Sequence, residues 1–238
     1  FEHLLKAPPP LGNDCFALPP GVHWTPVDEA LAQLRARLHP VTPVEDVALA
    51  ATLGRIAAAD VLARRANPPL PNTAVDGYGF AGAREAGAHA MPLAEGRAAA
   101  GDAPGALAEG QAIRVLTGAA LPEGVDTVVL QEDVTIDGRT LRFNGPVKQG
   151  ANTRKAGEDV TAGAVTLRAG RRITAADIAL LAATGTASVS PHRPLRVGVL
   201  STGDEIVEAG RTAAEGQIFD ANRPMLLGLV SQFGHQGV

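Results

Sequence analysis

The chain has 238 residues, of which 45% are hydrophobic but only 3% aromatic, so any core is built mainly from Ala, Val and Leu. This length suits one large domain or two ordinary ones. The formal net charge is −4 and no long basic run occurs, which argues against a nucleic-acid partner. No stretch approaches the roughly 20 apolar residues of a membrane span. One cysteine, Cys15, and the lack of a signal-peptide pattern lead us to expect a cytoplasmic protein.

The first part of the chain is predicted to be a Pro-rich linker, residues 1–23, followed by a helix. Apolar residues recur at helical spacing over Val27–Leu38, after Thr25 as a candidate cap and Pro26 in the first turn. We assign residues 24–43 to a helix that packs on an α/β domain.

The middle of the chain loses helical periodicity and is rich in Gly, Pro and short β-branched runs. Short strands are predicted near Val47 and over 57–61, then over 113–117 and 127–131. Residues 134–143 are expected to form a hairpin, since Asp137-Gly138 suits a type I′ turn. We predict an inserted β-barrel-like domain over 62–163, and a small α+β linking domain from 44–61 and 164–185.

The last part of the chain begins with a strand at 164–167 and a helix at 175–184, with Thr174 and Asp177 as a capping box and Gly185 as its end. Residues 195–200 form an apolar run typical of a buried parallel strand. A loop over 201–220 and a helix over 222–233 follow, which is how an α/β domain starts. A single strand has no neighbour to pair with, so we expect the domain over 186–238 to be incomplete as given, or completed by another chain. The predicted class is therefore α+β and α/β in several domains.

The most distinctive stretch is Asn67-Pro68-Pro69-Leu70-Pro71-Asn72-Thr73-Ala74-Val75-Asp76-Gly77-Tyr78-Gly79-Phe80. Its prolines keep the segment extended, and Asn72, Asp76 and Gly77 are typical turn residues. From the residues alone, Asp76 either caps a turn in a connector or is a binding acid on a constrained loop.

Four segments in the same order give the chain a family resemblance. The stretch above resembles the P-x-x-x-N-S-A-M-D-G-Y-A pattern of the molybdopterin molybdenumtransferases, which include bacterial MoeA proteins and the E domain of gephyrin. Thr73, Val75 and Gly79 depart from that pattern. The other segments are Arg114-Val115-Leu116-Thr117-Gly118-Ala119 with Leu121-Pro122-Glu123-Gly124, Asn152-Thr153-Arg154 with Gly157-Glu158-Asp159, and Ser201-Thr202-Gly203-Asp204-Glu205. The resemblance covers the chain from about Trp24 onward, and family members continue beyond its last residue. We therefore identify a C-terminally truncated member, in which residues 186–238 start a three-layer molybdopterin-binding α/β domain.

The resemblance implies an enzyme of molybdenum cofactor biosynthesis. Its substrates are molybdate and adenylylated molybdopterin, which a molybdopterin adenylyltransferase makes upstream, and it releases AMP. The residues that match functional family positions are Asp76, Thr117, Asp159 and Glu205. In the family the β domain of one subunit faces the α/β domain of its partner, so the resemblance implies a homodimer with Glu205 across the interface from the other three.

The charges of this set require a cation. An acid about 4 Å from one negative charge is opposed by roughly 4 kcal/mol at an effective dielectric near 20. Carboxylates beside molybdate and phosphate therefore make sense only around a cation, and Mg²⁺ suits Asp76, Asp159 and Glu205. Arg154 and Lys155 are candidate anion-binding residues. The loop after the 195–200 strand and the start of the next helix supply further candidates: Ser201, Thr202, Gly203, Asp204, Asp220 and Asn222.

Two other functions remain open: a non-catalytic dimerisation or scaffold module of the same family, and a metal-dependent nucleotide hydrolase. A dinucleotide site is excluded, because the G-x-G-x-x-G match at 77–82 follows prolines and precedes no amphipathic helix. The six histidines lack zinc-ligand spacing, and Ser201 lacks a nucleophile elbow.

Overall fold

A computed structural model describes residues 25–238. The predictions for residues 1–23 lie outside this range. The chain divides into two compact units, 1–41 and 42–238. The first holds helix α1, Val27–Arg37, which confirms the predicted helix to within one residue. Its N-cap is Pro26 and no side chain caps it, so the expected Thr25 cap is wrong.

In the second unit, two stretches that lie far apart in the sequence form strands that pair with each other. Strand β1, Val47–Ala48, pairs antiparallel with β12, Ser188–Val189, and β2, Val61–Leu62, pairs antiparallel with β11, Val165–Leu167. A short 3-10 turn, η2, spans Leu49–Ala51. Helix α2, Ala175–Ala183, has the predicted capping box between Thr174 and Asp177. These elements enclose one core, made of Leu49, Ala57, Leu167, Ile173, Leu181 and Val189.

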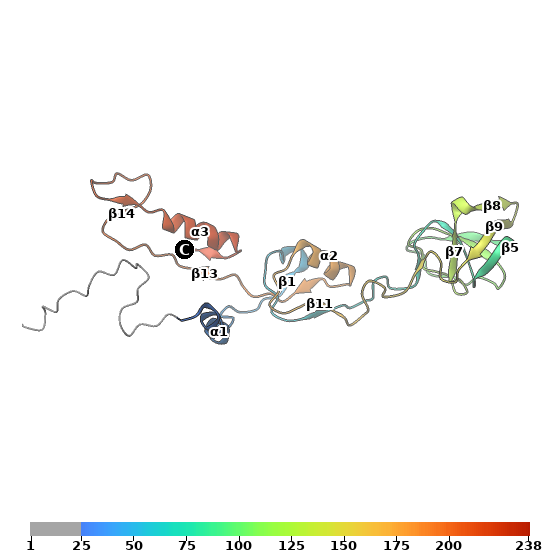
Figure 1. Cartoon of the computed structure of the whole chain (residues 1–238), viewed down its shortest axis with the longest axis horizontal. Coiled ribbons are helices and arrows are strands. Elements are labelled where there is room, and N and C mark those ends of the chain that lie inside the picture. Colours follow the sequence, from blue (N-terminus) through green and yellow to red (C-terminus); the bar gives the residue numbers. More distant parts are fainter. Residues whose placement is uncertain (1–24) are drawn as a thin grey trace, which may run out of the picture. The chain divides into compact units, whose positions relative to one another are not determined.

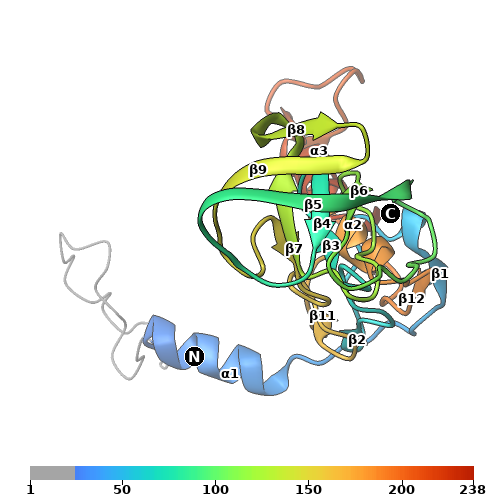
Figure 2. The same ribbon diagram turned by 90° about the vertical axis from the view of Figure 1, so that its right-hand side faces the viewer.

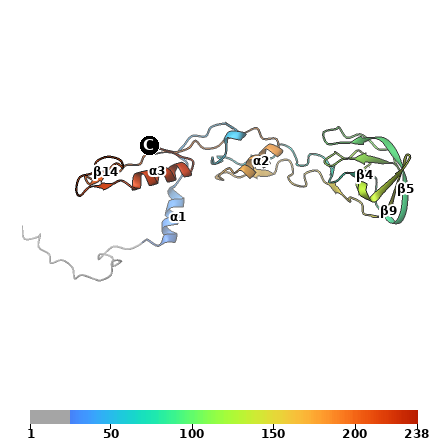
Figure 3. The ribbon, with the colours of Figure 1, turned by 90° about the horizontal axis from the view of Figure 1, so that it is seen from above.

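The chain between β2 and β11 builds a six-stranded sheet in the order β7-β4-β6-β5-β9-β8. Its strands are β4 Gly77–Phe80, β5 Arg84–Ala98, β6 Ala112–Val115, β7 Thr127–Leu130, β8 Val134–Asp137 and β9 Thr140–Val147. Within this sheet, β5 and β6 are the one neighbouring pair of strands that runs parallel. Figure 1 places β5, β7, β8 and β9 in this group, Figure 2 shows β5 and β9 curving side by side, and Figure 3 adds β4. The fold is thus mixed α+β, with a curled half-barrel sheet and few helices.

Several predicted strands of this sheet are confirmed, and two were missed. Strands β6 and β7 match the predicted runs, and the 134–143 hairpin forms as β8 and β9. Its turn was misplaced, because Asp137 pairs with Thr140 and the loop residues are Gly138 and Arg139. Sequence patterns assigned no strand to 77–80 or 84–98. These runs are rich in Gly and Ala, and their strand conformation depends on their neighbours in the sheet.

At position 77, strands β4 and β7 approach so closely that only glycine fits. A Cβ there would lie 2.1 Å from the Val129 carbonyl oxygen and 2.9 Å from Val128 Cγ1. Phe80, the last residue of β4, stacks on Phe143 of β9 with ring centroids 5.4 Å apart, in a core that also holds Met91 and Leu141. Because Gly77 has no side chain, β7 can pack close to β4, and the Phe80 ring lies in the core of the sheet.

The C-terminal part differs from its prediction in three ways. Strand β13 is only Arg196–Val197, and it pairs in parallel with β16, Gln236–Gly237, so the expectation of a strand without a neighbour is wrong. Within the stretch predicted as loop, β14 Ile206–Val207 pairs in parallel with β15 Ile218–Phe219.

The run 195–200 is also not buried as expected, since Leu200 is 87% exposed. A two-stranded ribbon with one helix cannot cover both faces of a strand. Helix α3, Asn222–Gln232, confirms the last predicted helix. No helix within residues 25–238 is long and apolar enough to cross a membrane.

Candidate active site

Asp76 lies on a short loop between β3, Asn72–Thr73, and β4. The loop is folded locally by Thr73, whose buried hydroxyl donates to the Val75 carbonyl at 2.7 Å and accepts from the Val75 N–H at 3.3 Å. Strand β3 is paired with β10, Thr153–Arg154, so Thr73 lies opposite Thr153. The turn expected from the residues of this segment is therefore present, and these hydrogen bonds hold it.

Thr117 fixes the Asp76 carboxylate. Its N–H and its hydroxyl both donate to Asp76 Oδ1 at 2.7 Å. These two bonds, helped by the positive charge of Arg114, hold the pKa of Asp76 below its ordinary value. Asp76 Oδ2 accepts no hydrogen bond from the residues that the structure describes, which leaves it free to bind a ligand.

Asn152 holds the same loop through two further hydrogen bonds. It is the one non-glycine residue with a positive φ, 56°, within the described range. Its carbonyl accepts from the Ala74 N–H, and its amide donates to the Val128 carbonyl, both at 2.9 Å. Asparagine tolerates this left-handed backbone better than most residues. The Asp76 loop is therefore tied to β7 through Asn152.

Arg154, a candidate anion-binding residue, forms ion pairs with two acids of its own segment. Its guanidinium pairs with Glu158, at 3.0 Å from Nε to Oε1, and with Asp159 through Nη2. The Glu158 hydrogen bond, then that of Asp159, raises the pKa of Arg154, and Arg154 in turn lowers the pKa of Glu158. The N–H of Lys155 also donates to Glu158, at 3.1 Å. Arg154 thus serves to hold two acids in place.

The start of α3 is likewise occupied. Asp220 Oδ1 accepts from the N–H groups of Asn222 at 3.1 Å and Arg223 at 3.0 Å, and Oδ2 accepts from the Ser201 hydroxyl at 2.5 Å. The Arg223 N–H bond and then the Ser201 bond lower the pKa of Asp220. The predicted anion site at this helix end is therefore filled by a carboxylate of the chain itself.

The loop between Ser201 and Ile206 is exposed at Thr202, Gly203, Asp204 and Glu205. Gly203 has φ 145°, and a Cβ there would lie 2.7 Å and 2.8 Å from the two Glu205 carboxylate oxygens. The Glu205 carboxylate thus occupies the space that a side chain at 203 would need.

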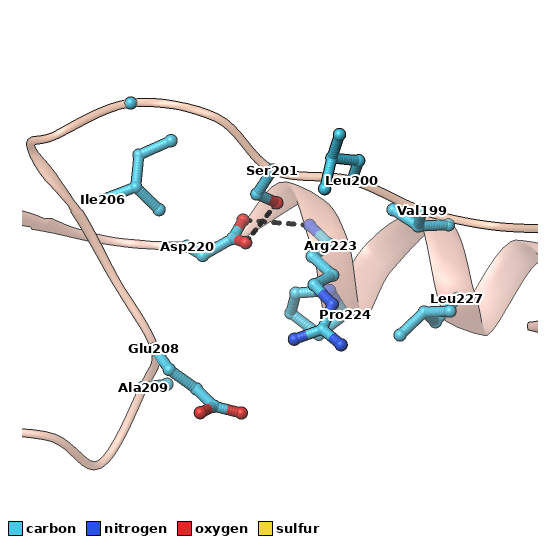
Figure 4. Close-up of a pocket in the computed structure, with 11 residues that line it drawn as sticks. Val199, Leu200, Ser201, Ile206, Glu208, Ala209, Asp220, Arg223, Pro224 and Leu227 are labelled. Carbon is cyan, nitrogen blue, oxygen red and sulfur yellow. Dashed lines mark hydrogen bonds between the residues drawn. The ribbon is translucent and has the colours of Figure 1, made fainter. Parts of the chain in front are cut away.

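A pocket of about 610 Å³ lies beside this loop (Figure 4). Its lining residues are Val199, Leu200, Ser201, Gly203, Ile206, Glu208, Ala209, Asp220, Arg223, Pro224 and Leu227. Sequence reasoning had selected Ser201, Gly203 and Asp220 but missed Glu208 and Arg223. One signal was present for Arg223, because a cation in the first turn of a helix opposes the helix dipole.

The three acids expected to hold a cation do not form one group within the part of the chain that the structure describes. Within residues 25–238, no group of three His, Cys, Asp or Glu side chains is placed to hold a metal ion. Asp76 pairs with Thr117, Asp159 with Arg154, and Glu205 folds over Gly203. Their oxygen donors are of the kind that suits Mg²⁺.

Comparison with known proteins gives a consistent result. Residues 25–185 match a family model described as MoeA N-terminal region (domain I and II). A molybdopterin molybdenumtransferase from Haemophilus influenzae is 37% identical over 199 residues, which are 83% of this chain and 49% of that protein. One from Synechococcus elongatus is 33% identical, over 80% of this chain and 49% of that protein.

Solved structures agree with these relatives. A molybdopterin biosynthesis MoeA protein from Pyrococcus horikoshii superposes with a TM-score of 0.79 at 33% identity, over 91% of this chain and 59% of that one. The chain spans about half the length of the curated relatives it matches.

Proposed function

The chain belongs to the MoeA N-terminal region family, and we propose that it acts in molybdenum cofactor biosynthesis as a molybdopterin molybdenumtransferase. The proposed reaction takes adenylylated molybdopterin and molybdate, places molybdenum on the dithiolene and releases AMP. The relatives named molybdopterin molybdenumtransferase support this assignment. A molybdopterin adenylyltransferase would supply the substrate, with both proteins in the cytoplasm.

The Asp76–Thr117 pair is the observation that carries the proposal. Two donors on one carboxylate oxygen fix the orientation of the group and keep it ionised. Its second oxygen then faces a ligand without the cost of ordering a free side chain. A turn-capping acid would have its bonds within its own turn, whereas Thr117 is 41 residues away. This favours the binding role over the connector role.

Mg²⁺ is part of the proposal. Bound beside the two anionic substrates, it would neutralise their charge and polarise the phosphoanhydride. Because one chain does not gather the three acids, we propose a homodimer in which Asp76, Thr117 and Asp159 of one copy face Glu205 of the other. Arg154 contributes by orienting Asp159. The domain that begins at residue 186 is proposed to bind molybdopterin through the 201–205 loop.

Replacement of Asp76 tests the assignment. Asp76→Ala should abolish molybdate-dependent AMP release and lower the melting temperature only slightly, since the partly exposed side chain loses just its two hydrogen bonds with Thr117. Asp137→Ala is the matched control, because Asp137 is an exposed acid of the six-stranded sheet whose carboxylate pairs with Arg142. Retained turnover in Asp76→Ala would exclude the role given to Asp76.

The alternative is a non-catalytic dimerisation or scaffold module. Within residues 25–238 no group of three acids is placed to hold a metal ion, which is why this reading stays beside the first. It predicts no AMP release by the wild-type chain at any molybdate concentration, together with a concentration-dependent dimer in analytical ultracentrifugation.

A further inference from the structure

Asn152 lies where three parts of the candidate site meet. It directly precedes β10, which pairs with β3, and these two short strands form a two-stranded ribbon of their own. Asp76 follows the last residue of β3 by three positions, and Asp159 follows the last residue of β10 by five. The ribbon therefore joins the two segments that carry these acids.

The side chain of Asn152 fastens the ribbon to the six-stranded sheet. Strand β7 is an edge strand of that sheet, so part of its backbone faces away from β4. The Val128 N–H donates to the Ala151 carbonyl at 3.0 Å, and the Val128 carbonyl accepts from the Asn152 amide at 2.9 Å. Val128 is fully buried, so removal of the amide would leave a buried carbonyl without its donor, which is costly.

The backbone of Asn152 holds the Asp76 loop. Its carbonyl accepts from the N–H of Ala74, two residues before Asp76, at 2.9 Å. Asn152 makes both contacts with a left-handed backbone, φ 56°. Glycine adopts this backbone freely, whereas alanine adopts it only with strain.

The other end of the ribbon holds Asp159. Arg154 lies opposite Asn72 in the ribbon, and its guanidinium donates to the Asp159 carboxylate through Nη2. The N–H of Asp159 donates to the Asn67 carbonyl at 3.0 Å. A displacement of the ribbon would therefore move Asp159 as well as the Asp76 loop.

We propose that Asn152 is a positioning residue, which fixes the ribbon on the sheet and so sets the positions of Asp76 and Asp159 relative to each other. It acts through the segments that carry these acids. Asparagine combines the two properties that the position requires, since glycine has no amide and aspartate has no N–H to donate. This inference rests on the proposed function, for which it names the residue that arranges two acids of the site.

Amide hydrogen exchange in the 238-residue chain, followed by NMR, measures this arrangement without turnover. Two amides report on the site: the N–H of Thr117, which donates to Asp76, and the N–H of Asp159. The N–H of Thr184, which donates to the Leu180 carbonyl at the end of α2, reports on the rest of the fold. Local opening raises exchange only at the amides that lose their partners, whereas global unfolding raises it at all three.

Variants of Asn152 separate its two contributions. We expect Asn152→Ala to speed exchange at Thr117 and Asp159 about tenfold or more, with Thr184 unchanged. Asn152→Gly keeps the backbone and loses only the amide, so it should have a smaller effect. Asn144→Ala is the matched control, since Asn144 is an exposed asparagine of β9, and it should change none of the three amides.

Molybdate-dependent AMP release then measures what the arrangement does for the reaction. The value of kcat should fall about tenfold in Asn152→Gly and further in Asn152→Ala, because small displacements of reacting groups are costly. Thr174→Ala lowers stability by removing the cap of α2 but should leave kcat unchanged. A fall in kcat that merely followed stability would appear in Thr174→Ala as well.

The proposal is overturned if Asn152→Ala exchanges its Thr117 and Asp159 amides as the wild type does, or if Thr184 shares the increase. Equal kcat in the wild type and in Asn152→Ala overturns it as well. If the wild-type chain releases no AMP, the proposed function fails, and the exchange measurement decides the positioning role by itself.

Discussion

Gly77→Ala should destabilise the half-barrel sheet and move the loop that holds Asp76. The added Cβ would lie 2.1 Å from the Val129 carbonyl oxygen, where ordinary contacts begin at 3.4 Å. Strand β7 would have to retreat by about 1 Å, and the atom in the way is backbone, so no side-chain rotation relieves the clash. All four residues of β4 pair with β7, so a shift of β7 would disturb every residue pair between these two strands.

The magnitude follows from two opposing effects. Overpacking of this kind costs about 1–3 kcal/mol, and a backbone clash belongs at the upper end. Replacing glycine by alanine also restricts the unfolded chain, which returns about 0.4–1 kcal/mol. The net loss should be about 2 kcal/mol. Gly105→Ala is the matched control, since a Cβ there meets nothing within 4 Å and its φ lies outside the left-handed region. It should be neutral or slightly stabilising.

Urea unfolding followed by far-UV circular dichroism measures both variants. The reasoning is refuted if the free energy of unfolding of Gly77→Ala lies within about 0.5 kcal/mol of that of Gly105→Ala, the range of an ordinary surface substitution.

Three further predictions concern single contacts. Thr174→Ala should lower the free energy of unfolding by about 1 kcal/mol through loss of the α2 cap, while Thr174→Ser should keep it, as urea titration can check. Thr117→Val should raise the pKa of Asp76 toward its ordinary value of 3.8 in a carboxyl NMR titration. Because the wild-type pKa is lowered, the hydrogen bonds stabilise the fold above pH 3.8 and are lost as the pH falls through the lowered value, so the variant should lose less stability on acidification. Gly203→Ala should displace the Glu205 carboxylate and reduce AMP release, whereas Gly210→Ala, which also has a positive φ but no neighbour within 4 Å, should not.

Some features of the site were within reach of sequence reasoning but were missed. Arg154 and Glu158 stand four residues apart, and their pairing needs only this short spacing. The prediction that Arg154 binds an anion did not take these neighbouring acids into account, and it stays a prediction. Asp220 precedes α3 by two residues and caps it in the way that aspartate commonly does. The place of Arg223 in the lining of the pocket came only from the tertiary structure.

The sequence by itself determined the features that depend on residues close together in the chain. The capping box of α2 joins Thr174 to Asp177, the 134–143 hairpin pairs adjacent strands, and the motif around Asp76 lies in the region that matches the family model, residues 25–185. Tertiary structure alone decided the strands β4 and β5, whose Gly- and Ala-rich residues have little preference for a strand until β7 and β9 lie beside them. It also decided the orientation of Asp76, because its donor Thr117 is 41 residues away. Hydrogen bonds between residues close in the chain can be predicted from the local sequence, whereas contacts between distant segments form only in the folded sheet.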